Sequence, residues 1–124
     1  VSDALVGQID LLSSLASLVG SEERARDSQN LMDVFMGESD DGRNQLVIEA
    51  TSRTGFRKGD WVMIPPYDGP AVNKNVNIEL GNAEVYQLHD LNNDLAQQTN
   101  VADEHPEKLE EMLQDYQQII GENL

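Results

Sequence analysis

Basic side chains are scarce in this sequence, and half of them lie in one stretch. The chain holds 23 acidic residues against 8 basic ones, and its net charge is −15. Arg43, Arg53, Arg57 and Lys58 nevertheless fall within 16 positions, and Lys74 follows them. Such cations can bind anionic groups through charge-assisted hydrogen bonds. The alternative is that they pair with the surplus carboxylates at the surface, where ion pairs are common and weak.

The other residues capable of chemistry do not form a catalytic arrangement. The absence of cysteine excludes disulfides, thiolate metal sites and a cysteine nucleophile within these residues. His89 and His105 are the two histidines, the residue type best suited to acid–base chemistry near neutral pH, but neither has the neighbours of a catalytic pair, so we expect structural or exposed roles. The acidic loop with Glu38, Asp40 and Asp41 lacks EF-hand spacing and predicts a solvated turn. We therefore expect no catalytic residue and no metal ligand in this chain.

Charge and hydropathy exclude several classes of partner. The net charge of −15 repels DNA, RNA and anionic membranes. No stretch approaches the roughly 20 apolar residues of a membrane span. The sequence begins at Val1 without a basic flank or a signal-peptide pattern, which points to a fragment or a processed chain.

The N-terminal third predicts two helices. Residues 9–19 have helical periodicity, with Asp10 as the N-cap and Gly20 as the stop. Their apolar positions cover more than the usual face of a surface helix, so we expect this helix to lie against a larger body. The alternative is a central helix of this domain. Residues 29–36 predict a short helix with its apolar residues inward. The two apolar stripes of the first helix are Ile9, Leu12, Ala16 and Val19, and Leu11, Leu15 and Leu18.

The remaining sequence predicts a sheet and a terminal helix. Strands are expected at 45–50, 53–57, 60–64 and 84–89, with a tight turn at 58–60 and a long loop at 67–83. Residues 107–120 have the spacing of an amphipathic helix after Pro106. The fold class is therefore α+β, a four-stranded antiparallel sheet packed by a C-terminal helix. The buried face of that helix is expected to comprise Leu109, Met112, Leu113, Tyr116 and Ile120.

Four segments, taken in order, resemble the C-terminal part of the sulfatase family. IDLLSSLASLVG is similar to a family helix, with Ser13 at a position where the family usually has Pro. RNQLVIEA is similar to the strand that opens the small C-terminal subdomain. FRKGDWVMI is similar to the family hairpin, with Val62 where Lys is common. LHDLNNDLAQQTNVADEHPE resembles the segment before the last helix, with His89 at a Tyr position and Leu95-Ala96 replacing Pro-Gly.

The resemblance to arylsulfatase-type enzymes of the alkaline-phosphatase superfamily implies a division of the chain. Residues 1–41 would be the tail of a large catalytic α/β domain, with helices left over from it, and residues 42–124 the C-terminal subdomain. Family enzymes use calcium and a formylglycine made within a Cys/Ser-x-Pro/Ala-x-Arg motif, which this sequence lacks. The fragment alone is therefore expected to be inactive. Its partner would be the catalytic domain, and helix 9–19 would be open to self-association without it.

The family also suggests which residues meet a substrate. Loops of this subdomain border the cleft, so Arg53, Arg57, Lys74 and Asn75 are the candidates for contact with a sulfated glycan. The family's export implies a periplasmic or secreted location. Two alternatives stay open at this point: a free-standing acidic interaction module, and a fragment of a related phosphate or phosphonate ester hydrolase.

Overall fold

The chain forms two compact units, Val1–Leu46 and Val47–Leu124. The computed structural model describes residues 2–23, 25–50 and 53–121. Within these ranges, no helix combines the length and the apolar character needed to cross a bilayer.

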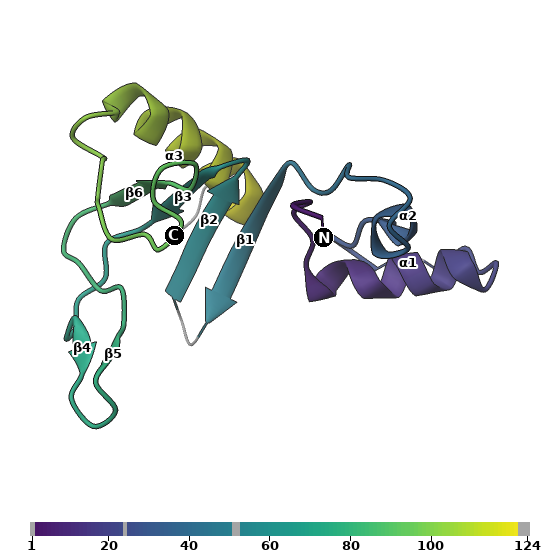
Figure 1. The fold of residues 1–124 in the computed structure, drawn as a ribbon, viewed down its shortest axis with the longest axis horizontal. Coiled ribbons are helices and arrows are strands. Elements are labelled where there is room, and N and C mark those ends of the chain that lie inside the picture. Colours follow the sequence, from purple (N-terminus) through teal and green to yellow (C-terminus); the bar gives the residue numbers. More distant parts are fainter. Residues whose placement is uncertain (1, 24, 51–52, 122–124) are drawn as a thin grey trace. The chain divides into compact units, whose positions relative to one another are not determined.

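The second unit contains the four-stranded sheet that the sequence predicts (Figure 1). Its strands are β1 (Gln45–Ala50), β2 (Arg53–Lys58), β3 (Trp61–Ile64) and β6 (Gln87–Asp90), in the order β1-β2-β3-β6. The first two residues of β1 belong to the first unit. The pairs β2–β3 and β3–β6 are antiparallel. The predicted α+β class is confirmed.

The turn between β2 and β3 shows why Gly59 is needed. Lys58 pairs with Trp61, so the connection is the two residues Gly59 and Asp60. Gly59 has a φ of +57°, a left-handed conformation that favours glycine in two-residue hairpin turns. The turn is thus one residue shorter than the predicted 58–60.

The predicted long loop contains structure of its own, and the fourth strand begins later than expected. The short strands β4 (Val72–Asn73) and β5 (Ile78–Glu79) pair as a small hairpin within residues 67–83. The main sheet resumes at Gln87 rather than at residue 84, where Gln87 pairs with Ile64. Pro65 follows Ile64 and has no amide hydrogen to donate, so the ladder stops there.

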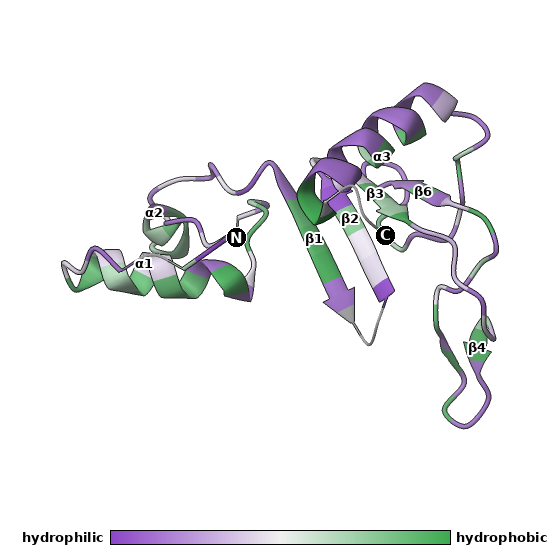
Figure 2. Cartoon of the chain, turned by 180° about the vertical axis from the view of Figure 1, so that it is seen from behind, coloured by the Kyte–Doolittle hydropathy of each residue, from purple (hydrophilic) through white to green (hydrophobic). Residues whose placement is uncertain are grey.

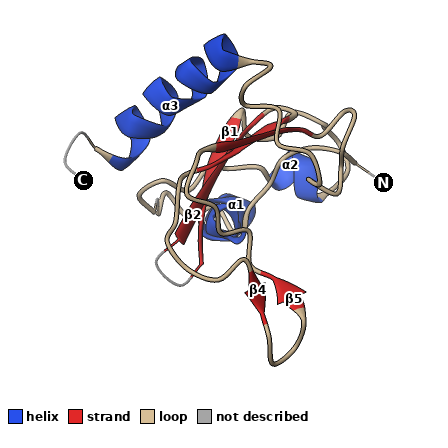
Figure 3. Ribbon diagram, turned by 90° about the vertical axis from the view of Figure 1, so that its left-hand side faces the viewer, coloured by secondary structure: helices blue, strands red, loops and turns tan. Residues whose placement is uncertain are grey.

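The helix α3 (Pro106–Ile120) packs along one face of this sheet (Figures 1 and 3). Phe56, Met63, Leu88 and Met112 are fully buried in the core between the two layers. The predicted apolar face of the helix is confirmed. Trp61 is partly buried and packs against this core. The helix contributes Leu109, Met112, Leu113, Tyr116 and Ile120 to this core.

Lys58 fastens the hairpin to the polar side of α3. Its Nζ lies 2.7 Å from Glu111 and also contacts Asp115. The hydrogen bonds that Lys58 donates to Asp115 and Glu111 raise the pKa of Lys58. Hydrogen bonds from Lys108 and Lys58 lower the pKa of Glu111 to about 2. These groups are partly exposed, so the network adds specificity more than stability.

The first unit contains α1 (Leu11–Leu18), preceded by a 3₁₀ turn at Gln8–Asp10, and α2 (Met32–Phe35). Gly20, at a φ of +72°, ends the first helix as predicted. The expectation for the second helix was partly wrong. Leu31 is buried, but Phe35 and Met36 are exposed. The helix is a single turn of four residues, and none of the four is fully buried.

Asp10 is the centre of the first unit. Its fully buried carboxylate accepts hydrogen bonds from the amides of Gly7 and Gln29 and from the guanidinium of Arg43. Asp10 occupies the predicted N-cap position, but its side chain does not cap the helix. Burial alone would raise the pKa of Asp10, yet the bonds from Arg43, Gln29 and Gly7 outweigh it and lower that pKa.

The helix α1 turns its small polar residues inward. Ser13 and Ser14 are buried and bond to the segment at Ser28–Leu31. The leucines point outward: Leu12 is 55% exposed and Leu15 is 52% exposed. Figure 2 shows the hydrophobic character along this helix. The predicted excess of apolar surface is therefore real, and the described residues of this unit leave it open.

Substitution of Met112 tests the packing of the core in the second unit. We expect Met112→Ala to destabilise this unit by about 2–5 kcal/mol, because it opens a cavity where the side chain is fully buried. The matched control is Ile119→Ala on the same helix, where 46% of the residue is exposed. Denaturant unfolding should show little change for this control. Equal losses in both variants would contradict the packing described.

Substitution of Asp10 tests the contribution of its buried ion pair with Arg43 to the stability of the first unit. We expect Asp10→Asn to cost about 3–5 kcal/mol, because Arg43 then remains buried without its counter-ion. Hydrogen exchange at the amides of Gly7 and Gln29 is the measurement, with the exposed Asp3→Asn as the control.

The lowered pKa of Asp10 adds a pH dependence to the same measurement. The stability that Asp10 contributes is fully present above the unfolded pKa of about 4 and is lost as pH falls through the lowered folded value. Unchanged protection in Asp10→Asn at neutral pH would refute this account.

Candidate functional site

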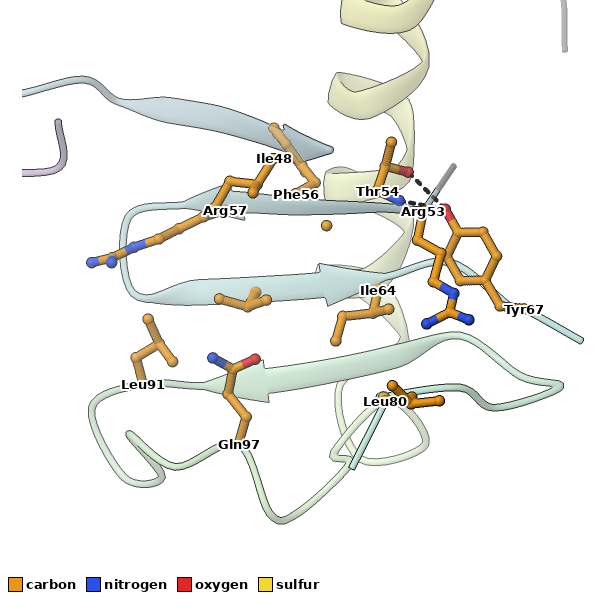
Figure 4. Close-up of a pocket in the computed structure, with 13 residues that line it drawn as sticks. Ile48, Arg53, Thr54, Phe56, Arg57, Ile64, Tyr67, Leu80, Leu91 and Gln97 are labelled. Carbon is orange, nitrogen blue, oxygen red and sulfur yellow. Dashed lines mark hydrogen bonds between the residues drawn. The ribbon is translucent and has the colours of Figure 1, made fainter. Parts of the chain in front are cut away.

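Arg53 and Arg57 share one hollow on the face of the sheet that α3 leaves uncovered. The hollow measures about 390 Å³ and is lined by residues of the second unit only. Figure 4 shows both arginines on the near side of the sheet, with α3 passing behind it. Sequence reasoning proposed these two residues as ligand contacts, and the structure brings them together.

The alternation of side chains along β2 produces this arrangement. Thr54, Phe56 and Lys58 face α3, where they contact Tyr116, the core and the acidic residues of that helix. Successive side chains of a strand point to opposite faces. Arg53 and Arg57 therefore lie on the other face.

The floor of the hollow is largely apolar, and its centre carries no side chain. Gly55 lies between the two arginines in the strand, and a Cβ added there would meet no atom within 4 Å. A glycine inside a strand often marks a place where a ligand approaches closely. The surrounding aliphatic side chains are Ile48, Val62, Ile64, Leu80 and Leu91.

Hydrogen bonds fix the polar rim. The Tyr67 hydroxyl accepts a bond from the amide of Thr54 and lies 3.1 Å from its hydroxyl. Thr54 in turn bonds to Tyr116 of α3, so the rim is anchored to the helix layer. Arg57 donates from Nε to the carbonyl of Gly59 at 3.0 Å, which orients its guanidinium.

The electrostatics of the hollow differ from those of the chain as a whole. The 13 lining residues include two arginines and no carboxylate, although the chain carries a net charge of −15. Elsewhere in the basic stretch, Arg43 pairs with Asp10, and Lys58 pairs with α3. Among the described residues, neither Arg53 nor Arg57 takes part in an ion pair. The hollow therefore favours an anion with an apolar or flat body.

Lys74 and Asn75 are not part of this hollow. They are exposed in the connection between β4 and β5, which Figure 1 shows projecting from the rest of this unit. The Asn75 amide bonds to the side chain of Asn73 within that turn. Leu80 and Gly81, which directly follow β5, line the hollow, whereas the turn with Lys74 and Asn75 does not.

Sequence reasoning missed Tyr67 and Gln97 as lining residues. Tyr67 follows the strand-ending Pro65-Pro66, and Gln97 lies in the connection after β6. No local pattern identifies either residue, because their positions depend on where two long connections return to the sheet. Gln97 has a φ of +54°, which is uncommon outside glycine.

The histidines have structural positions. His89 is 3% exposed, and its Nδ1 lies 2.9 Å from the carbonyl of Thr99. The ring of His105 packs edge-on against Trp61. Over residues 2–23, 25–50 and 53–121, no three His, Cys, Asp or Glu side chains converge as a metal site.

Comparisons with known proteins agree on one family. No protein-family model matches the chain. An N-acetylgalactosamine-6-O-sulfatase of Bacteroides thetaiotaomicron is 37% identical over an alignment of 113 residues. The match covers 88% of this chain and 22% of that protein.

Two solved structures share the fold. One is labelled as a 6S-sulfatase from work on the metabolism of multiple glycosaminoglycans by B. thetaiotaomicron. It is 34% identical with a TM-score of 0.87 and covers 95% of this chain and 25% of that chain. The second, Ps i-CgsB, is 15% identical with a TM-score of 0.61, covers 93% of this chain and 24% of that chain, and shows the fold alone.

The chain thus spans only about a quarter or less of the length of these proteins. The resemblance that the sequence segments indicated is confirmed, since sequence and fold point to the same proteins. By both measures, this chain belongs with the C-terminal part of the sulfatase family.

Proposed function

We propose that this chain is the C-terminal part of an enzyme that hydrolyses sulfate esters on a glycan. The observation that carries the proposal is the match to an N-acetylgalactosamine-6-O-sulfatase across 88% of the chain. The structural match at a TM-score of 0.87 supports it independently of local sequence. These matches favour a sulfatase over a free-standing acidic module or a phosphate ester hydrolase.

We assign the two parts of the chain to different domains of that enzyme. Residues 1–41 would end the catalytic α/β domain, and residues 42–124 would form the C-terminal subdomain. The exposed leucines of α1 support this division, because a helix with an open apolar face gains stability by packing on another layer. The same face is what self-association through helix 9–19 would use.

The bond-breaking chemistry is assigned to the rest of the protein. A sulfate ester accumulates spread negative charge as it is cleaved, so converging cations must stabilise it. Calcium and a formylglycine would supply that stabilisation and the nucleophile. The described residues do not fit either group: they form no metal cluster, and the sequence has no Cys/Ser-x-Pro/Ala-x-Arg motif. The C-terminal part would therefore support the catalytic domain.

We propose that Arg53 and Arg57 contact the substrate beside the reacting centre. Their shared hollow, its lack of carboxylates and its apolar floor support this role. For Lys74 and Asn75, contact with the substrate stays a prediction, since they lie at the end of a separate hairpin. By analogy with the family, we also propose export to the periplasm or beyond the cell.

The whole protein should release inorganic sulfate from a sulfated glycan, whereas the 124-residue chain alone should release none. The physical reason is that these residues supply neither the nucleophile nor the metal. Sulfate release is measured with each protein in the presence of calcium, and buffer serves as the blank. Turnover of an aryl sulfate by the isolated chain would contradict the assignment of the chemistry.

The role of α1 can be tested by one substitution in two proteins. In the isolated chain, Leu15→Ala should change stability by no more than about 0.5 kcal/mol, because Leu15 is half exposed. In the whole protein, it should cost about 2–5 kcal/mol if the leucine is buried there. Ser17→Ala on the same helix is the control. Light scattering on the isolated chain measures self-association, and equal effects of Leu15→Ala in both proteins would refute the docking role.

A further inference from the structure

We propose that the hollow binds a linear glycan through two of its anionic groups, one held by Arg53 and the other by Arg57, with a sugar ring lying across Gly55. This inference rests on the proposed function, because it takes the substrate to be an anionic glycan. It adds that the chain recognises an oligosaccharide rather than a single sulfated sugar.

The spacing of the two cations supports recognition of two groups. Arg53 and Arg57 are four residues apart on one strand, so their Cα atoms lie about 13 Å apart along β2. Arg57 donates to the Gly59 carbonyl, and Figure 4 shows its side chain extending away from Arg53, so the two guanidiniums do not converge on one sulfate or carboxylate in this structure. The spacing suits an extended chain of sugar rings that carries anionic groups at intervals. The strand is central in the sheet, so the spacing is rigid.

The surface between the arginines has room for a ring. Gly55 leaves open space above the strand, and its φ is not in the left-handed region, so backbone strain does not explain the glycine. The aliphatic side chains of Val62 and Ile64 lie on the same face in the adjacent strand. An apolar floor with a few placed polar groups is the usual composition of a small-molecule site.

Both arginines are placed to receive anions. A guanidinium can bind a carboxylate or a sulfate through two parallel N–H donors. Arg57 uses Nε for the Gly59 carbonyl, and its terminal nitrogens make no hydrogen bond to another described residue. Arg53 lies beside Tyr67 at the opposite end of the hollow, as Figure 4 shows. The two cations therefore mark the two ends of one site.

The charge of the chain restricts where a polyanion can bind. A net charge of −15 opposes general attraction of such a ligand. Lys58 and Lys108 are already engaged by the carboxylates of α3, and Arg43 by Asp10. Binding of an anionic glycan should therefore depend on the two arginines of the hollow rather than on positive charge in general.

The first experiment measures binding to the whole protein by titration calorimetry. The probe is an unsulfated tetrasaccharide of alternating hexuronic acid and N-acetylgalactosamine, which offers two carboxylates and no ester to hydrolyse. We expect Arg53→Gln and Arg57→Gln each to weaken binding by roughly tenfold, and the corresponding disaccharide to bind the unaltered protein more weakly. Lys108→Gln removes the same charge on α3, outside the hollow, and should change binding by less than about twofold. Equal losses in all three variants would overturn the proposal.

A second variant keeps both arginines and fills the space between them. Gly55→Val should preserve the thermal midpoint, because a valine suits a strand and its Cβ meets no neighbour. It should nevertheless weaken tetrasaccharide binding by roughly tenfold. Unchanged binding would overturn the placement of the ring.

The competing occupant is an acidic segment of the protein itself. In that case, Arg53→Gln and Arg57→Gln would lower the thermal midpoint of the whole protein and leave tetrasaccharide binding unchanged, which would overturn the inference. Sulfate release is scored separately. If the protein releases sulfate but neither arginine substitution weakens tetrasaccharide binding, the proposed function stands and this inference fails. If the protein releases no sulfate but both substitutions weaken tetrasaccharide binding, the proposed function fails and the hollow is still a glycan site.

Discussion

The alternation of side chains along β2 is the constraint on which the second unit depends. On one face of the strand, Phe56 packs in the core and Lys58 contacts the acidic residues of α3. On the other face, Arg53, Gly55 and Arg57 line an open hollow. A shift of one residue in register would exchange these sets, burying two guanidiniums beneath the helix and exposing a phenylalanine. Stability and the proposed anion recognition therefore require the same register.

The first unit is held together mainly by polar contacts and buries little apolar surface. Its centre is a buried carboxylate that joins the segments before Asp10, around Gln29 and at Arg43, while its helix turns leucines outward. Nearby, a side chain on Gly42 would clash with the backbone of Leu5, since its Cβ would lie 2.4 Å from the Leu5 carbonyl oxygen. Close backbone approach and a satisfied ion pair hold this unit together with little apolar burial. A unit built in this way keeps its apolar surface available for another layer.

Sequence patterns predicted the elements well where a local period decides the structure. The face of α3 and the Gly59 hairpin follow from side-chain spacing and from the conformational freedom of glycine. The inward serines of α1 were not predictable, because the apolar stripes alone suggest the reverse orientation. The partners of Arg43 and Lys58 were open from sequence, and distant carboxylates at Asp10 and Glu111 decided them. The hollow was predicted only through its two arginines, since Tyr67 and Gln97 reach it by long connections.

The residues that carry the family resemblance build the fold rather than its chemistry. Gly59 makes the turn, Trp61 and Leu88 pack in or beside the core, and Pro106 begins the last helix. These roles explain why the resemblance identifies the family without naming a substrate. The proposed specificity rests instead on side chains that face away from the core, where packing does not dictate the residue type. At ordinary ionic strength, charges are screened over about 8 Å, so the distant acids of the chain do not cancel Arg53 and Arg57 locally. The hollow can therefore attract an anion although the chain as a whole repels one.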